Sequence, residues 1–119
     1  MAKINVARAT PADGRRQRSG ESRRRIVEAM LELVRDGDAL PSADAVAARA
    51  GVGRRTVFRL FTDMESLYRE MHAMMVMRID HIRAIPIEGE TWRARLDCII
   101  ERRVRLYEEI LPIKAAADA

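Results

Sequence analysis

The stretch from Gly51 to Phe61, with the sequence GVGRRTVFRLF, constrains the fold more than any other part of this chain. Gly51 can adopt the left-handed conformation that ends a helix in a tight turn, and a second helix follows it directly. At about 100° per residue, the apolar side chains of this second helix share one face, namely Val57, Leu60 and Phe61. Arg55 and Arg59 point away from that face. The pattern predicts a helix-turn-helix with one packing face and one cationic face.

Hydrophobic residues recur at helical spacing along most of the remaining sequence. The low aromatic content of 4%, with six glycines and four prolines in 119 residues, disfavours a β-rich fold. We therefore expect an all-α fold. The expected helices span about 22–36, 43–50, 53–61, 64–84 and 91–111.

Three signals indicate where these helices begin and end. Ser42 follows Pro41 and is a favourable N-cap for the second helix. Thr62 and Glu65 match a capping box, in which two residues three apart satisfy each other's free backbone N–H groups at a helix start. Pro112 is expected to interrupt the last helix, because proline lacks the N–H that the helix needs.

Length and residue usage limit the setting in which this protein works. A chain of 119 residues fits one domain with a substantial helical core. No apolar run approaches the roughly 18 residues that a membrane helix needs, and the N-terminus lacks the apolar segment of a signal peptide. Cys98 is the only cysteine, and a lone thiol fits a reducing compartment. We expect a cytoplasmic protein that has no membrane partner.

Positive charge is concentrated at the N-terminus. Residues 1–25 hold eight basic and two acidic side chains, a net charge of +6, whereas the rest of the chain holds 14 basic and 16 acidic ones, a net charge of −2. Pro11 and Gly14 occur where helical periodicity is absent, so residues 1–20 are expected to form a flexible basic arm. Such an arm suits nucleic acid, and a merely solvated tail fits the same pattern.

Arg23, Arg24 and Arg25 are expected in the first turn of the first helix, where the helix dipole disfavours cations. A DNA phosphate near the helix start would make this placement favourable, with Arg24 as the candidate contact. Three solvated arginines are the alternative interpretation.

Four stretches together carry a resemblance to a known family: Ile26–Gly37, ADAVAARAGV at 43–52, TVFRLF at 56–61 and ESLY at 65–68. Through them, residues 23–71 resemble the DNA-binding domain of the tetracycline-repressor (TetR) family of bacterial transcription regulators. The resemblance implies a three-helix bundle with a helix-turn-helix at 21–68. It also implies a long connecting helix and the first helices of an incomplete C-terminal domain at 69–119.

The resemblance implies that the helix at about 53–61 enters the major groove of DNA. The positions it assigns to DNA contact are Ser42, Gly53, Arg54, Arg55, Thr56, Phe58, Arg59 and Leu60. Ser42 and the amide of Gly53 would face phosphates. Arg55 and Arg59 are also indicated by their direction alone, because a guanidinium can donate two hydrogen bonds to guanine O6 and N7.

The function implied is sequence-specific regulation of transcription by a ligand-responsive repressor that binds a double-stranded DNA operator. In this family a C-terminal domain dimerises and binds a small-molecule inducer. The inducer shifts the population toward a conformation that releases DNA, here through the helix at about 64–84. The helices of the dimer interface are expected beyond Ala119. A shortened chain that stays monomeric would contact one half-site only.

We expect the remaining candidate residues to have structural rather than chemical roles. His72 and His81 lie about 180° apart on one helix, so they cannot bind one metal ion together. The methionines at 71, 74, 75 and 77 indicate an adaptable hydrophobic core rather than a ligand cavity. Cys98 is expected to be a buried apolar residue. The sequence has no phosphate-binding loop, nucleophile elbow or Cys/His cluster. We therefore expect no enzyme activity, no cofactor and no metal.

Two other functions fit the same residues. A helical interaction module would bind a partner helix through the apolar stripes of residues 64–111. A sequence-independent nucleic-acid binder would show steep salt dependence without preferring one operator. Replacing Arg55 and Arg59 separates these readings, because only a sequence-specific DNA binder would lose its preference.

Overall fold

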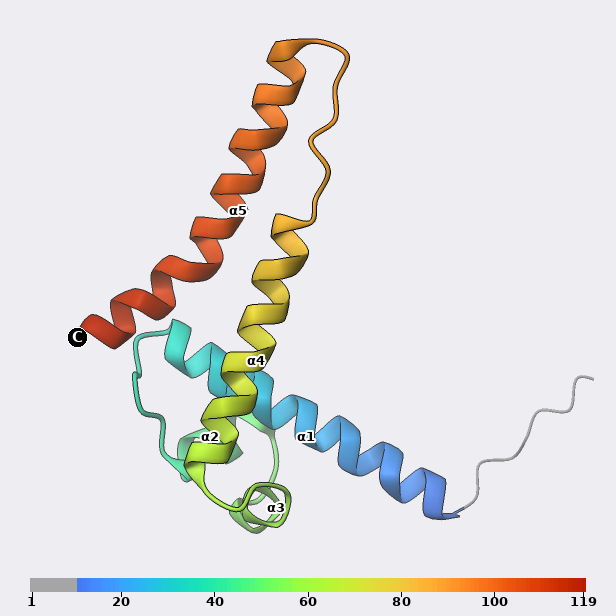
Figure 1. Cartoon of the computed structure of the whole chain (residues 1–119). Coiled ribbons are helices and arrows are strands. Elements are labelled where there is room, and N and C mark those ends of the chain that lie inside the picture. Colours follow the sequence, from blue (N-terminus) through green and yellow to red (C-terminus); the bar gives the residue numbers. More distant parts are fainter. Residues whose placement is uncertain (1–10) are drawn as a thin grey trace, which may run out of the picture.

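Five helices make up residues 11–119, the part of the chain that the structure describes, and no strand occurs in this range. The computed structural model places them in the order α1 (Pro11–Arg35), α2 (Ala43–Ala50), α3 (Arg54–Leu60), α4 (Met64–Arg83) and α5 (Trp92–Asp118). The expected all-α fold is confirmed. Figure 1 shows α3 at one end of the molecule and the connection between α4 and α5 at the other.

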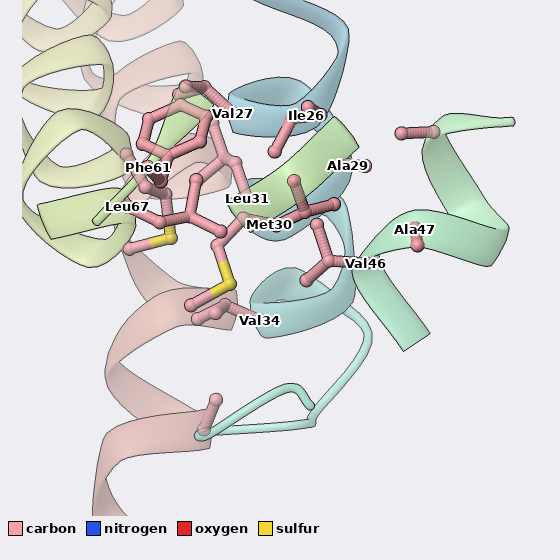
Figure 2. Close-up of a cluster of buried hydrophobic side chains, with 14 residues drawn as sticks. Ile26, Val27, Ala29, Met30, Leu31, Val34, Val46, Ala47, Phe61 and Leu67 are labelled. Atoms are coloured by element: carbon pink, nitrogen blue, oxygen red, sulfur yellow. The ribbon is translucent and has the colours of Figure 1, made fainter. Parts of the chain in front are cut away.

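A hydrophobic core joins α1, α2 and the first half of α4, and α3 closes one side of it. Ile26, Val46 and Leu67, one from each of these three helices, have no exposed surface. Figure 2 shows the core side chains pointing toward one another between the ribbons. Full burial of an aliphatic side chain stabilises a fold by about 1.5–3 kcal/mol. Val57 of α3 belongs to the same cluster, which therefore holds α3 in a fixed place relative to α1.

The first helix begins at Pro11, well before the expected start near residue 22. Proline at the first helical position costs nothing, because the N–H it lacks would have no partner there. Asp13, in the first turn, adds a favourable charge at the positive end of the helix dipole. The expectation of a flexible arm over 1–20 is therefore wrong for residues 11–20, and residues 1–10 lie outside the described range.

One expected N-cap is confirmed, and another lies one residue later than expected. Ser42 caps α2 as expected, since its Oγ accepts a hydrogen bond from the amide of Ala45 at 3.1 Å. The capping box of α4 lies one residue later than expected. Asp63, not Thr62, is the N-cap, and its Oδ1 accepts from the amide of Ser66 at 2.7 Å. The prediction failed because aspartate caps a helix as well as threonine does.

The last helix continues through Pro112 to Asp118, so the expected interruption is wrong. Proline at 112 leaves the carbonyl oxygen of Glu108 without its usual helical donor. Arg35 of α1 supplies a replacement, because its Nη2 donates to that oxygen at 3.2 Å. Its Nη1 also pairs with the Glu109 carboxylate at 2.9 Å. The end of α5 then packs on the core through Ala116, which is buried.

Beyond the core, α4 and α5 run side by side as a long hairpin (Figure 1). One face of α5 stays uncovered along most of its length. Its large apolar side chains are 44–70% exposed: Trp92, Leu96, Ile100, Val104, Tyr107 and Leu111. Within residues 11–119, no helix has the length and hydropathy needed to cross a lipid bilayer.

Candidate nucleic-acid interface

The turn between α2 and α3 has the geometry that its glycines suggest. Gly51 ends α2 with φ of 70°, in the left-handed region. The amide of Val52 then donates to the carbonyl oxygen of Ala47 at 3.0 Å, which satisfies one of the free carbonyl groups at the helix end. Gly53 is the N-cap of α3 and makes no side-chain capping bond. Two short helices thus meet across a turn of three residues.

The two faces of α3 differ as the sequence predicted. Val57 is 1% exposed, and Phe61, which ends the helix, is 2% exposed. Arg55 and Arg59 are exposed on the other side. Neither guanidinium has an ion pair or a hydrogen bond within residues 11–119. Their charge is therefore available to an external ligand.

The other polar side chains of α3 are tied to their neighbours. Arg54 lies over the ring of Phe58, with 5.5 Å between its guanidinium carbon and the ring centroid. Its Nη1 is also 3.7 Å from Oδ1 of Asp44 in α2. Phe58 is 42% exposed, and Thr56 is half-buried. The charge of Arg54 is thus partly balanced inside the molecule, unlike that of Arg55.

Arg23 fixes the end of α3 to α1, a contact that sequence analysis missed. Its Nη1 donates to the main-chain oxygen of Leu60 at 2.7 Å. The guanidinium lies over the ring of Phe61, at 4.4 Å from the centroid, and also pairs with Glu70 of α4. One side chain therefore joins three helices. No local pattern reveals it, because Arg23 and Leu60 are 37 residues apart.

Two predicted contact residues lie differently from expectation. The interpretation of Arg24 as a residue of the first turn is wrong, because α1 begins at Pro11. Its Nε instead pairs with Glu28 at 3.1 Å, four residues along the same helix. Leu60 is half-buried and packs against the core, so its side chain is not part of the exposed face of α3. Ser42 and Gly53 are exposed at the starts of α2 and α3.

The chemical candidates outside this region remain dispersed. His72 and His81 are both exposed. No group of three or more potential metal ligands converges within residues 11–119. Met71 is buried in the core as expected, whereas Met77 is 73% exposed. Cys98 is half-buried rather than fully buried, and its Sγ lies 3.2 Å from the carbonyl oxygen of Glu88.

Comparison with known proteins gives no relative. No protein-family model, no curated protein and no solved structure matches this chain significantly.

Proposed function

We propose that this protein is a sequence-specific DNA-binding regulator of transcription of the tetracycline-repressor type, in which α2 and α3 form a helix-turn-helix and α3 enters the major groove. One observation carries the proposal. Arg55 and Arg59 stand one helical turn apart on the exposed face of α3, without partners in the described chain, while Val57 and Phe61 anchor the opposite face.

The spacing of the two arginines suits the edges of neighbouring base pairs. Four residues on a helix rise about 6 Å, and the major groove, about 12 Å wide, admits a helix. A guanidinium can donate two hydrogen bonds to O6 and N7 of guanine, which contributes roughly 1–3 kcal/mol of discrimination against the wrong base. Arg55 and Arg59 are thus the proposed base contacts, and Ser42, Gly53, Arg54 and Thr56 the proposed flanking contacts.

Rigid support of α3 strengthens this proposal, because a base contact is specific only if its side chain is held in place. Arg23 holds the end of α3 through the Leu60 oxygen. Arg49 of α2 pairs with Asp36, the residue that follows α1, at 3.0 Å and with Glu32 of α1 at 3.4 Å. These hydrogen bonds, that to Asp36 first, raise the pKa of the Arg49 guanidinium above its ordinary value. The α1–α2 contact thus keeps its positive partner at every pH of practical interest.

The wider regulatory scheme rests on the resemblance. We propose repression in the cytoplasm, relief by a small-molecule inducer that acts through α4, and a two-fold dimer on a palindromic operator. In that scheme α4 is the element through which an inducer would change the position of α3, since its first half belongs to the same core.

A second candidate function is supported by the exposed apolar face of α5. Six large side chains repeat along it every three or four residues, from Trp92 to Leu111. A partner helix could cover such a stripe, as amphipathic helices do in grooves. In this alternative the protein is a helical interaction module, and the arginines of α3 serve only solubility.

The experiment that separates these functions replaces both arginines, Arg55→Ala with Arg59→Ala. The control, Arg103→Ala with Arg105→Ala, removes the same charge from exposed positions of α5. Binding is measured on the duplex that the wild type enriches from a random library and on a scrambled duplex. We expect the affinity ratio of the two duplexes to fall toward one in the α3 variant and to persist in the control. An unchanged ratio in the α3 variant would reject α3 as the base-contacting helix.

A further inference from the structure

The N-terminal half of α1 projects away from the other helices (Figure 1) and carries arginines that have no role in the core. Arg15 and Arg18 of this half and Arg25, just beyond it, are exposed, and we call them the α1 arginine stripe. None of the three has an ion pair or a hydrogen bond within residues 11–119. The pairing is different for six other arginines, which contact carboxylates: Arg23, Arg24, Arg35, Arg49, Arg54 and Arg69.

The stripe occupies one face of the helix. Steps of three and seven residues, from Arg15 to Arg18 and on to Arg25, return to nearly the same side of an α-helix. Of the two acidic residues in this half of α1, Asp13 lies about 160° from the centre of the stripe, and Glu21 lies at its edge. This face carries three cations and one anion, because Glu21 is three residues from Arg18 and four from Arg25.

This face is on the side of α1 where α2 packs. Another step of seven residues leads from Arg25 to Glu32, which pairs with Arg49 of α2. The groove between α1 and α4 is lined from α1 by Gly20, Arg23, Arg24 and Val27. Those residues lie about 120–180° around α1 from the centre of the stripe. The stripe therefore lies on the side of α1 that α2 covers, and α4 lies on the other side.

The stripe also has a defined reach. Arg23 marks the point where α3 is attached to α1, and the helix extends from there to Pro11, a distance of about 18 Å. The stripe itself covers about 15 Å. Duplex DNA carries one phosphate charge per about 1.7 Å of axis, so this length spans roughly nine phosphate charges. A helix holds its side chains at fixed spacing, which a flexible arm does not.

From these observations we infer that the α1 arginine stripe binds phosphate groups of the duplex DNA that α3 contacts, on one flank of the bases recognised by Arg55 and Arg59. The inference rests on the proposed function. It adds a rigid, sequence-independent contact that supplies affinity through counterion release. It also gives a role to three exposed cations that have no partner within residues 11–119.

The test removes the stripe with Arg15→Gln, Arg18→Gln and Arg25→Gln, because glutamine keeps helix propensity and removes charge. The matched control is Arg16→Gln, Arg103→Gln and Arg105→Gln, which are exposed positions off the stripe. Far-UV circular dichroism checks that both variants keep their helices. Affinity for a 30-base-pair duplex of random sequence is then measured between 0.05 and 0.2 M salt.

We expect the slope of log affinity against log salt to become shallower by about 2.7 in the stripe variant, at 0.9 per lost phosphate contact. Over this salt range the wild type would then lose roughly 40-fold more affinity than the variant. The control should keep the wild-type slope. Preference for the enriched duplex over a scrambled one should survive in the stripe variant, because phosphate contacts carry no sequence information.

Each other outcome has a distinct meaning. Equal slopes for the wild type and both variants would overturn the stripe contact and leave the proposed function standing. Equal shallowing in the stripe and control variants would also overturn it, because the effect would then reflect net charge alone. A wild type that binds duplex DNA without preferring any sequence would contradict the proposed function only. Failure of the wild type to bind any duplex would overturn both.

Discussion

Arg23 lies over the ring of Phe61, with 4.4 Å between the guanidinium carbon and the ring centroid, and so connects α1 to the end of α3. The same guanidinium donates to the main-chain oxygen of Leu60 at 2.7 Å. A charged donor thus satisfies a carbonyl at the negative end of the α3 dipole. The orientation of the proposed base-contacting helix depends on this side chain.

Replacing Arg23 with methionine keeps the aliphatic stem and removes the charge. We expect Arg23→Met to lower the free energy of unfolding by about 2 kcal/mol, mostly through the bond to Leu60 and the ring contact. The pair with Glu70 contributes less, because both side chains are about 40% exposed. Urea unfolding gives the value. Arg24→Met, which removes only a pair within α1, should cost less than about 0.5 kcal/mol, and equal losses would refute the role of Arg23.

The effects of substituting Arg35 and Pro112 on the free energy of unfolding should be coupled. We expect Pro112→Ala to raise the free energy of unfolding by about 1–3 kcal/mol, because the helix regains an internal hydrogen bond. Arg35→Met should lower it, and by less once alanine occupies position 112, since the Glu108 oxygen then has its own donor. A double-mutant cycle in urea measures the coupling. A coupling energy of zero would contradict this explanation of the continuous α5.

Substitution of the two glycines of the α2–α3 turn should change the stability of the protein in opposite directions. Gly51→Ala forces a side chain into the left-handed region and should cost about 1–2 kcal/mol. Gly53 has open space around its Cβ position and extended backbone angles, so Gly53→Ser should add an N-cap and gain a few tenths of a kcal/mol. Thermal unfolding followed by circular dichroism ranks the three proteins. Destabilisation by Gly53→Ser would show that the start of α3 has another constraint.

Truncation of Leu67 should destabilise the protein, whereas truncation of Leu40 should have little effect. Leu67 has no exposed surface, and Leu67→Ala should cost about 2–5 kcal/mol through lost burial and a cavity. Leu40 is 83% exposed, so Leu40→Ala should stay within about 0.5 kcal/mol of the wild type. Chemical denaturation of both variants checks the difference. Similar losses of unfolding free energy at the two positions would contradict the placement of Leu67 in the core.

Short-range patterns predicted most of the fold, because they depend on residues close in sequence. The bounds of α2, the left-handed Gly51 and the buried Val57 followed from periodicity and capping rules. The start of α1 was missed because proline can open a helix as well as break one. The continuity of α5 through Pro112 could not be foreseen, since it depends on Arg35, more than 70 residues away.

Helical geometry predicted part of the candidate interface as well. The outward direction of Arg55 and Arg59 followed from helical geometry alone. The environment of Arg24 and Leu60 did not, because it depends on where α1 begins and on how α3 packs against the core. The role of Arg23 needed three-dimensional contacts with both α3 and α4.

The central claim, sequence-specific DNA binding by α3, is tested most directly by selection from a randomised duplex library with the full chain, at about 0.15 M salt, where charges are screened over roughly 8 Å. We predict enrichment of one motif, with guanines at the positions that Arg55 and Arg59 contact. A palindromic motif would show that this chain dimerises, and a single half-site that it binds as a monomer. Absence of any enriched motif would contradict the claim.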